Sequence, residues 1–161
     1  MLAASPYTGS ITLPALTVPS TSSLTPALFS VNLPVWVEHL NYGNHLGHDR
    51  LISIMHEARL QYFSTLGVAE LPAPGATATG LIVSQLAVDY LGEAFYGDTL
   101  KIDLFARDIS RVRFVLDYRI TCREHAIARA SVTLAAFDYH RHRPVALPPK
   151  LKHGLTQTRV L

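Results

Sequence analysis

The sequence lacks the features that are typical of membrane-spanning, disulfide-bonded or nucleic-acid-binding proteins. It has one cysteine, Cys122, so no disulfide can form within its 161 residues. Charged or turn residues interrupt every apolar run before it reaches the roughly 18 residues of a membrane span. No dense basic run with interleaved aromatic residues suggests nucleic-acid binding. We therefore expect a single globular, cytoplasmic domain with no membrane span and no nucleic-acid partner.

Charge is almost absent from the first part of the chain. All fourteen Lys and Arg residues lie at Arg50 or later, and Glu38 and Asp49 are the only ionised side chains before it. Residues 1–28 are rich in Ser, Thr, Pro and Ala, and fit neither a secretory signal nor an Arg-rich transit peptide. We expect these residues to be an extension, extended or partly disordered, before a domain of residues 29–155 and a tail of residues 156–161.

The hydrophobic pattern predicts one long helix within an antiparallel sheet. Residues 29–39 favour a first strand, with Pro34 at an edge or a bulge. From about residue 50, apolar side chains recur every three or four positions, which indicates a helix that Gly67 ends. The pattern then predicts four strands, at residues 81–91, 99–108, 112–122 and 126–139, before a tail that turns away at its prolines.

This order of elements is α+β: a curved antiparallel sheet wrapped around one central helix. Such a sheet leaves open edges, and pairing through an edge would cover them. We therefore expect a homo-oligomer.

The stretch from Glu38 to Arg59 holds four of the eight histidines. A metal site is one interpretation, but His56 follows His48 by more than two helical turns, so the histidines would not converge. There is no His-Glu-x-x-His motif and no cysteine pair. We expect no metal and no cofactor. Ser53 and Ser84 lack a surrounding Gly-x-Ser-x-Gly motif and are expected to be ordinary helix and strand residues.

Four short motifs occur in order with matching spacing. They are a segment that begins at His45, "HEAR" at 56–59 with "YFSTLG" at 62–67, "VDYLGEAFYGDTLKI" at 88–102, and "RPVALPPKL" at 143–151. Together they resemble the 4-hydroxybenzoyl-CoA thioesterase-like family of the hotdog fold. The resemblance runs from about residue 31 to residue 155.

The resemblance implies an acyl-CoA or acyl-carrier-protein thioesterase whose active site lies at the interface of a homodimer or homotetramer. The family's loop carboxylate, its usual base or nucleophile, would stand at residue 41, where this chain has Asn41. An amide can orient a water molecule but cannot accept its proton at neutral pH. The family's oxyanion donor would be the backbone N–H of His48, at the start of the helix, and Gly47 would let a carbonyl group approach closely.

Two residues are candidates for the missing base. Glu57 matches an acidic helix position that some hotdog thioesterases use, but it can also be an exposed glutamate that pairs with Arg50 or Gln61. His45 is the other candidate because histidine is the usual proton acceptor among side chains, but it can also be a histidine that only fixes the loop. Asn41 would then orient the water or the thioester carbonyl, unless it is simply a turn residue with left-handed backbone.

The acyl group would need an apolar wall, for which Tyr62, Phe95 and Tyr96 are candidates, although core packing is the alternative role for such residues. Two other functions stay open. A non-catalytic module that binds acyl thioesters would also fit Asn41. A hydroxyacyl dehydratase is less favoured, because Leu46 and Gly47 follow His45 where those enzymes have Pro-Gly.

Overall fold

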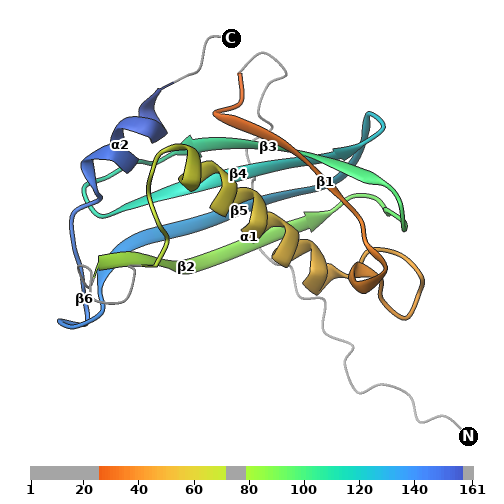
Figure 1. Cartoon of the computed structure of the whole chain (residues 1–161), viewed down its shortest axis with the longest axis horizontal. Coiled ribbons are helices and arrows are strands. Elements are labelled where there is room, and N and C mark those ends of the chain that lie inside the picture. The colour runs from red at the N-terminus through yellow and green to blue at the C-terminus, as the bar shows by residue number, and fades with distance from the viewer. Residues whose placement is uncertain (1–25, 72–78, 158–161) are drawn as a thin grey trace, which may run out of the picture.

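A curved antiparallel sheet wraps around one long helix in the computed structural model, which describes residues 26–71 and 79–157 (Figure 1). The strands lie side by side in the order β1-β3-β4-β5-β2, and the short β6 pairs with β5. This confirms the predicted α+β architecture. The elements are β1 Phe29–Pro34, the 3-10 helix η1 Val37–His39, α1 His48–Thr65, β2 Thr79–Tyr90, β3 Thr99–Arg107, β4 Arg113–Cys122, β5 His125–Asp138, β6 Arg143–Pro144 and α2 Pro149–Thr156.

The long helix α1 fills the concave side of the sheet. Its N-cap is Gly47, and it ends where Gly67 takes a positive φ of 63°, as the sequence predicts. The apolar stripe packs against alternating residues of β3, β4 and β5, each fully buried side chain contributing about 1.5–3 kcal/mol. The buried residues of the helix are Leu51, Ile54, Met55, Ala58, Arg59, Tyr62 and Phe63.

The convex face of the sheet carries paired charges. Asp103 accepts hydrogen bonds from Arg119 on the next strand, and Asp117 accepts them from Arg107. Both carboxylates are buried beneath these side chains. The hydrogen bond to Asp117 is the main cause that raises the pKa of Arg107. Arg107 is thus already engaged within the sheet.

The first strand is shorter than its sequence suggests. β1 stops at Pro34, whose missing N–H ends the ladder with β3. The next residue, Val35, is buried and donates its N–H to the carbonyl oxygen of Asp98. The chain then forms η1, so the strand predicted over residues 29–39 is wrong beyond residue 34.

The expectation that the C-terminal tail turns away is also wrong. Residues 149–156 form α2, with Leu151 and Leu155 in the core. Gly154 lies so close to Leu66 that an added Cβ would meet its side chain at 2.5 Å. Pro148 and Pro149 resemble helix breakers in the sequence, but proline is favoured in the first turn of a helix.

The replacement Leu151→Ala tests whether α2 belongs to the core. It deletes a side chain that has no exposed surface, so we expect the free energy of unfolding to fall by about 2–4 kcal/mol in urea denaturation. The neighbouring exposed Lys152→Ala should change it by less than about 0.5 kcal/mol. Equal effects of the two variants would contradict the packing.

Candidate functional site

A closed loop, residues 40–47, lies in front of α1. An antiparallel bridge joins Leu40 to Leu46, and the N–H of Asn41 donates to the carbonyl oxygen of His45 at 2.9 Å. The N–H of Gly47 donates to His39 at 2.9 Å, and that of Leu46 donates to Ala94, beyond β2, at 2.8 Å. These bonds fix the loop at both ends.

Asn41 and His45 come together within this loop. The Asn41 Oδ1 accepts the N–H of Gly43 at 2.8 Å, which makes an Asx-type turn. Its Nδ2 lies 3.5 Å from both ring nitrogens of His45. The left-handed residue of the loop is Asn44, with φ 62°, so the alternative that Asn41 fills that role is wrong.

A carboxylate that the sequence analysis did not single out completes this group. Glu93 Oε1 lies 3.9 Å from Nε2 of His45. It lies in the segment between β2 and β3, nearly fifty residues after the histidine, and no local motif connects the two. Only the folded chain places them side by side.

The start of α1 offers backbone donors next to Asn41. The first intrahelical bond runs from Leu51 N–H to the carbonyl oxygen of Gly47, so the N–H groups of residues 48–50 precede the helical ladder. A Cβ on Gly47 would lie 2.7 Å from Asp49 Oδ1 and 3.5 Å from the Cβ of Asn41. Asn41 thus lies close to the N-cap residue, and the positive helix end lies beside the loop.

His48 contacts the end of β2 through Tyr90. Their rings meet edge to face at 6.4 Å between centroids, and the tyrosine hydroxyl donates to the His48 carbonyl oxygen at 3.3 Å. Burial, and then the charge of Asp49, raise the pKa of Tyr90. The contact ties the helix start to β2.

Glu57 lies away from this group. It is ten residues beyond Gly47, about 15 Å along the helix axis. It lines a hollow of about 300 Å³ together with Pro34 and Trp36, on the β1 side of the helix. Its carboxylate accepts a hydrogen bond from Gln61 Nε2 at 2.8 Å, which is the local pairing that the sequence left open.

The three aromatic candidates do not gather at one place. Tyr62 is buried, and its hydroxyl donates to the carbonyl oxygen of Gly154 at 3.0 Å, so it packs α1 against α2. Phe95 and Tyr96 are exposed in the turn before β3. Ala94, which directly precedes them, accepts a backbone hydrogen bond from Leu46, so their turn lies next to the loop.

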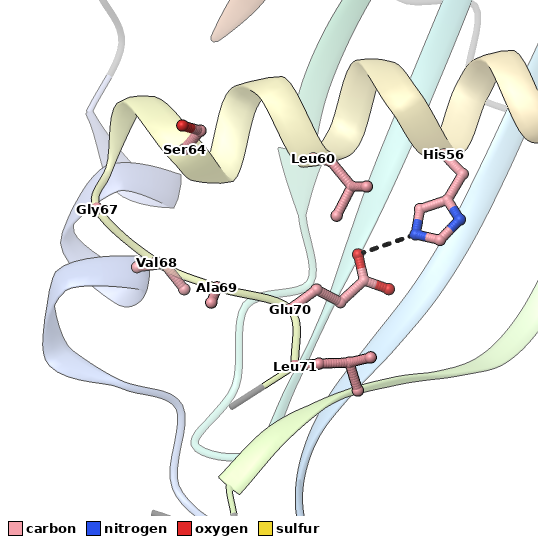
Figure 2. A pocket seen from close by; sticks show the side chains of 8 residues that line it. All are labelled: His56, Leu60, Ser64, Gly67, Val68, Ala69, Glu70 and Leu71. Carbon is pink, nitrogen blue, oxygen red and sulfur yellow. Dashed lines mark ion pairs between the residues drawn. The ribbon is translucent and has the colours of Figure 1, made fainter. Parts of the chain in front are cut away.

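A second cavity, of about 620 Å³, lies along the other half of α1 (Figure 2). His56 and Leu60 project from the helix toward the segment after Gly67, where Glu70 points back at the histidine. The His56 Nε2 and Glu70 Oε2 are 3.5 Å apart. Apart from this pair and Ser64, the lining is apolar.

Glu70 also holds a buried arginine. Arg59 Nε and Nη2 donate to its two carboxylate oxygens at 3.0 and 2.8 Å. Burial alone would lower the pKa of Arg59, but the hydrogen bonds and charge of Glu70 outweigh it and raise the pKa. Tyr118 lies beneath, where burial raises its pKa to about 12, although the charge of Arg59 opposes this. Its hydroxyl reaches no partner in hydrogen-bond geometry among the described residues.

Within residues 26–71 and 79–157, no group of three or more His, Cys, Asp or Glu side chains is arranged to hold a metal ion. The same part of the chain contains no helix that is both long and apolar enough to cross a membrane.

A sheet curved around one helix, with a polar loop at the helix start, defines the hotdog class of α+β proteins. The chain belongs to the thioesterase-like superfamily, whose sequence model matches residues 35–155.

Named relatives agree with this family. The chain is 24% identical to the acyl-CoA thioesterase YbgC of Haemophilus influenzae over 77% of its own length and 91% of the relative's. It is 28% identical to a 1,4-dihydroxy-2-naphthoyl-CoA hydrolase of Microcystis aeruginosa, over 65% and 76% of the two chains.

Solved structures show the same fold. A 1,4-dihydroxy-2-naphthoyl-CoA thioesterase from Synechocystis superposes with a TM-score of 0.74 at 19% identity, over 79% of this chain and 94% of the other. A Staphylococcus aureus protein solved in complex with CoA gives 0.73 at 18% identity, over 88% and 92%. The hotdog fold expected from the motifs is thereby confirmed.

The replacement Glu70→Ala tests the buried ion pair. It leaves the Arg59 guanidinium buried without its carboxylate, so we expect the free energy of unfolding to fall by about 3 kcal/mol. Tyr118→Phe serves as the control, because it removes an unpaired buried hydroxyl and should be close to neutral at pH 7. A Glu70→Ala variant as stable as the wild type would contradict this role of Glu70.

Proposed function

We propose that this protein hydrolyses acyl-CoA thioesters at the loop in front of α1, with His45 as the proton acceptor. Thioester hydrolysis is the reaction named for its relatives. The observation that carries the site is the convergence of Asn41 and His45 beside the first backbone N–H groups of the helix.

The reaction needs an activated water molecule and a donor for the negative oxygen that develops on the carbonyl carbon. In our proposal, His45 takes the proton of the attacking water. Asn41 orients that water or the thioester carbonyl through its amide. The N–H of His48 donates to the oxyanion, assisted by the helix dipole, and Gly47 leaves space for the carbonyl group.

His45 is a better base candidate than Glu57 in this structure. The histidine lies beside Asn41 and the helix start, whereas Glu57 lies about 15 Å along the helix and is hydrogen-bonded to Gln61. Phe95 and Tyr96, in the turn joined to the loop, stay candidates for contact with the acyl group or the pantetheine arm. Tyr62 is left out of this proposal because it is buried between α1 and α2.

CoA is the carrier that we propose, in preference to an acyl-carrier protein. The relatives are named for CoA thioesters, and one structural neighbour was solved with CoA. A cytoplasmic location, where CoA esters are available, stays a prediction. The non-catalytic binding module is the second candidate, because Asn41 removes the carboxylate that the resemblance leads one to expect.

We also propose that two copies of the chain pair through β2. This strand has twelve residues and pairs only with β5 among the described residues, so one edge is open. A hollow of about 240 Å³ between α1 and β2 is lined by Ile52, Val83 and Leu86, which are partly exposed apolar side chains. An exposed edge beside apolar side chains is the kind of surface that a second copy covers.

The activity is tested by thiol release from a panel of short, long and aromatic acyl-CoAs. We expect turnover by the wild type, a fall of about 10²-fold or more in His45→Ala, and less than about two-fold change in Glu57→Gln. The reverse order of the two variants would make Glu57 the base. No thiol release by the wild type, together with stabilisation by CoA, would favour the binding module.

The pairing is tested by the native mass of the Leu86→Lys variant. A charge on the apolar side of the β2 edge should shift a dimer to monomers at micromolar concentration. Val37→Lys is the matched control, since Val37 is an exposed apolar residue of η1, outside the β2 edge. A Leu86→Lys variant that stays dimeric would exclude this edge as the interface.

A further inference from the structure

The loop with Asn41 lacks a carboxylate, but Glu93 brings one to its side. Glu93 Oε1 lies 3.9 Å from Nε2 of His45, and the Asn41 amide contacts the same imidazole at 3.5 Å. The imidazole of His45 therefore has an amide and a carboxylate as neighbours.

The backbone around Glu93 is fixed, although its side chain is largely exposed. On one side, the N–H of Gly92 donates to the carbonyl oxygen of Ile127, and a Cβ on Gly92 would lie only 2.6 Å from the carbonyl oxygen of Ala126. On the other side, Ala94 is fully buried and its carbonyl oxygen accepts the N–H of Leu46. Glu93 is thus held between β5 and the residue that follows His45.

Asp49, a carboxylate that follows the loop, is less suited to this role. Asp49 lies at the helix start, where its Oδ2 is 3.5 Å from Nε of Arg50, so its charge is already paired. A negative charge on the first turn would also disfavour an oxyanion at the same N–H groups. The structure shows no contact between Asp49 and His45.

We propose that Glu93 acts on His45 as a positioning residue and takes over the charge that the loop lacks at Asn41. This inference rests on the proposed hydrolysis with His45 as proton acceptor. The Glu93 carboxylate faces Nε2, directly or through one bridging water across the 3.9 Å gap, and so favours the tautomer with its proton on Nε2. Nδ1 then accepts the proton of the water. The imidazolium ion that forms is stabilised by Glu93 at Nε2 and by the carbonyl oxygen of Leu46, 3.3 Å from Nδ1. The proton then leaves on the departing CoA thiolate.

The test compares Glu93→Gln with the wild type on the acyl-CoA that the wild type turns over best. Two opposite charges about 4 Å apart in water already account for about a five-fold effect, so kcat should fall about five-fold or more. KM should stay within about two-fold, because Glu93 acts on the transition state and not on substrate binding. Glu124→Gln, at an exposed turn between β4 and β5, is the matched control and should keep wild-type kinetics.

A second variant separates this role from a structural one. Glu93→Asp keeps the carboxylate, so it should retain most of the kcat that Glu93→Gln loses. A merely destabilised loop would not be rescued in this way, and equal melting temperatures of the variants would exclude unfolding as the cause.

The outcomes distinguish this inference from the function on which it rests. An active wild type, an inactive His45→Ala variant and an unchanged Glu93→Gln variant would overturn the role of Glu93 alone. A Glu93→Asp variant whose kcat is as low as that of Glu93→Gln would also overturn it. A wild type without thiol release on any acyl-CoA would overturn both proposals.

Discussion

The site depends on one backbone hydrogen bond, from Leu46 to the carbonyl oxygen of Ala94. Both residues are buried, so water does not compete for the bond, and leaving either group unpaired would cost about 1–3 kcal/mol. The bond joins two segments that are nearly fifty residues apart in the chain. It places His45 beside Glu93 and brings the start of α1 to the end of β2, where His48 contacts Tyr90.

The large elements follow from local physical patterns and could be predicted. Alternation in β3 separates Leu100, Ile102 and Leu104, which are buried under α1, from Asp103 and Arg107 on the other face. The helix was predictable because its apolar stripe repeats with the helical period and Gly67 supplies the left-handed residue that ends it. These signals lie within short windows of the sequence, where one face of each element is buried.

The missed features arise from contacts between distant segments. Pro148 and Pro149 begin α2, and only the packing of Leu151 into the core distinguishes a helix start from a break. Arg59 falls on the buried side of α1 because Glu70, eleven residues later, neutralises it there. Glu93 could not be recognised as a partner of His45, because the two residues are nearly fifty positions apart and no local motif connects them. Sequence reasoning singled out the loop and the helix start as a candidate site, but it could not choose between His45 and Glu57.

The structure separates those two candidates by helix geometry. Successive helical residues point about 100° apart, so His56 and Glu57 face different sides of α1. His56 lines the hollow toward β2, and Glu57 lines the hollow toward β1. The side toward β2 carries the open edge, the apolar hollow and the His56–Glu70 pair, and it is the side on which a second copy of the chain is proposed. A substrate that enters between two copies would therefore meet His56 along the helix, while Glu57 faces away. The loop residues lie at the end of this same side, where Tyr90 contacts His48. Our proposal therefore has the water proton accepted in the loop, at His45, with Glu93 beside it.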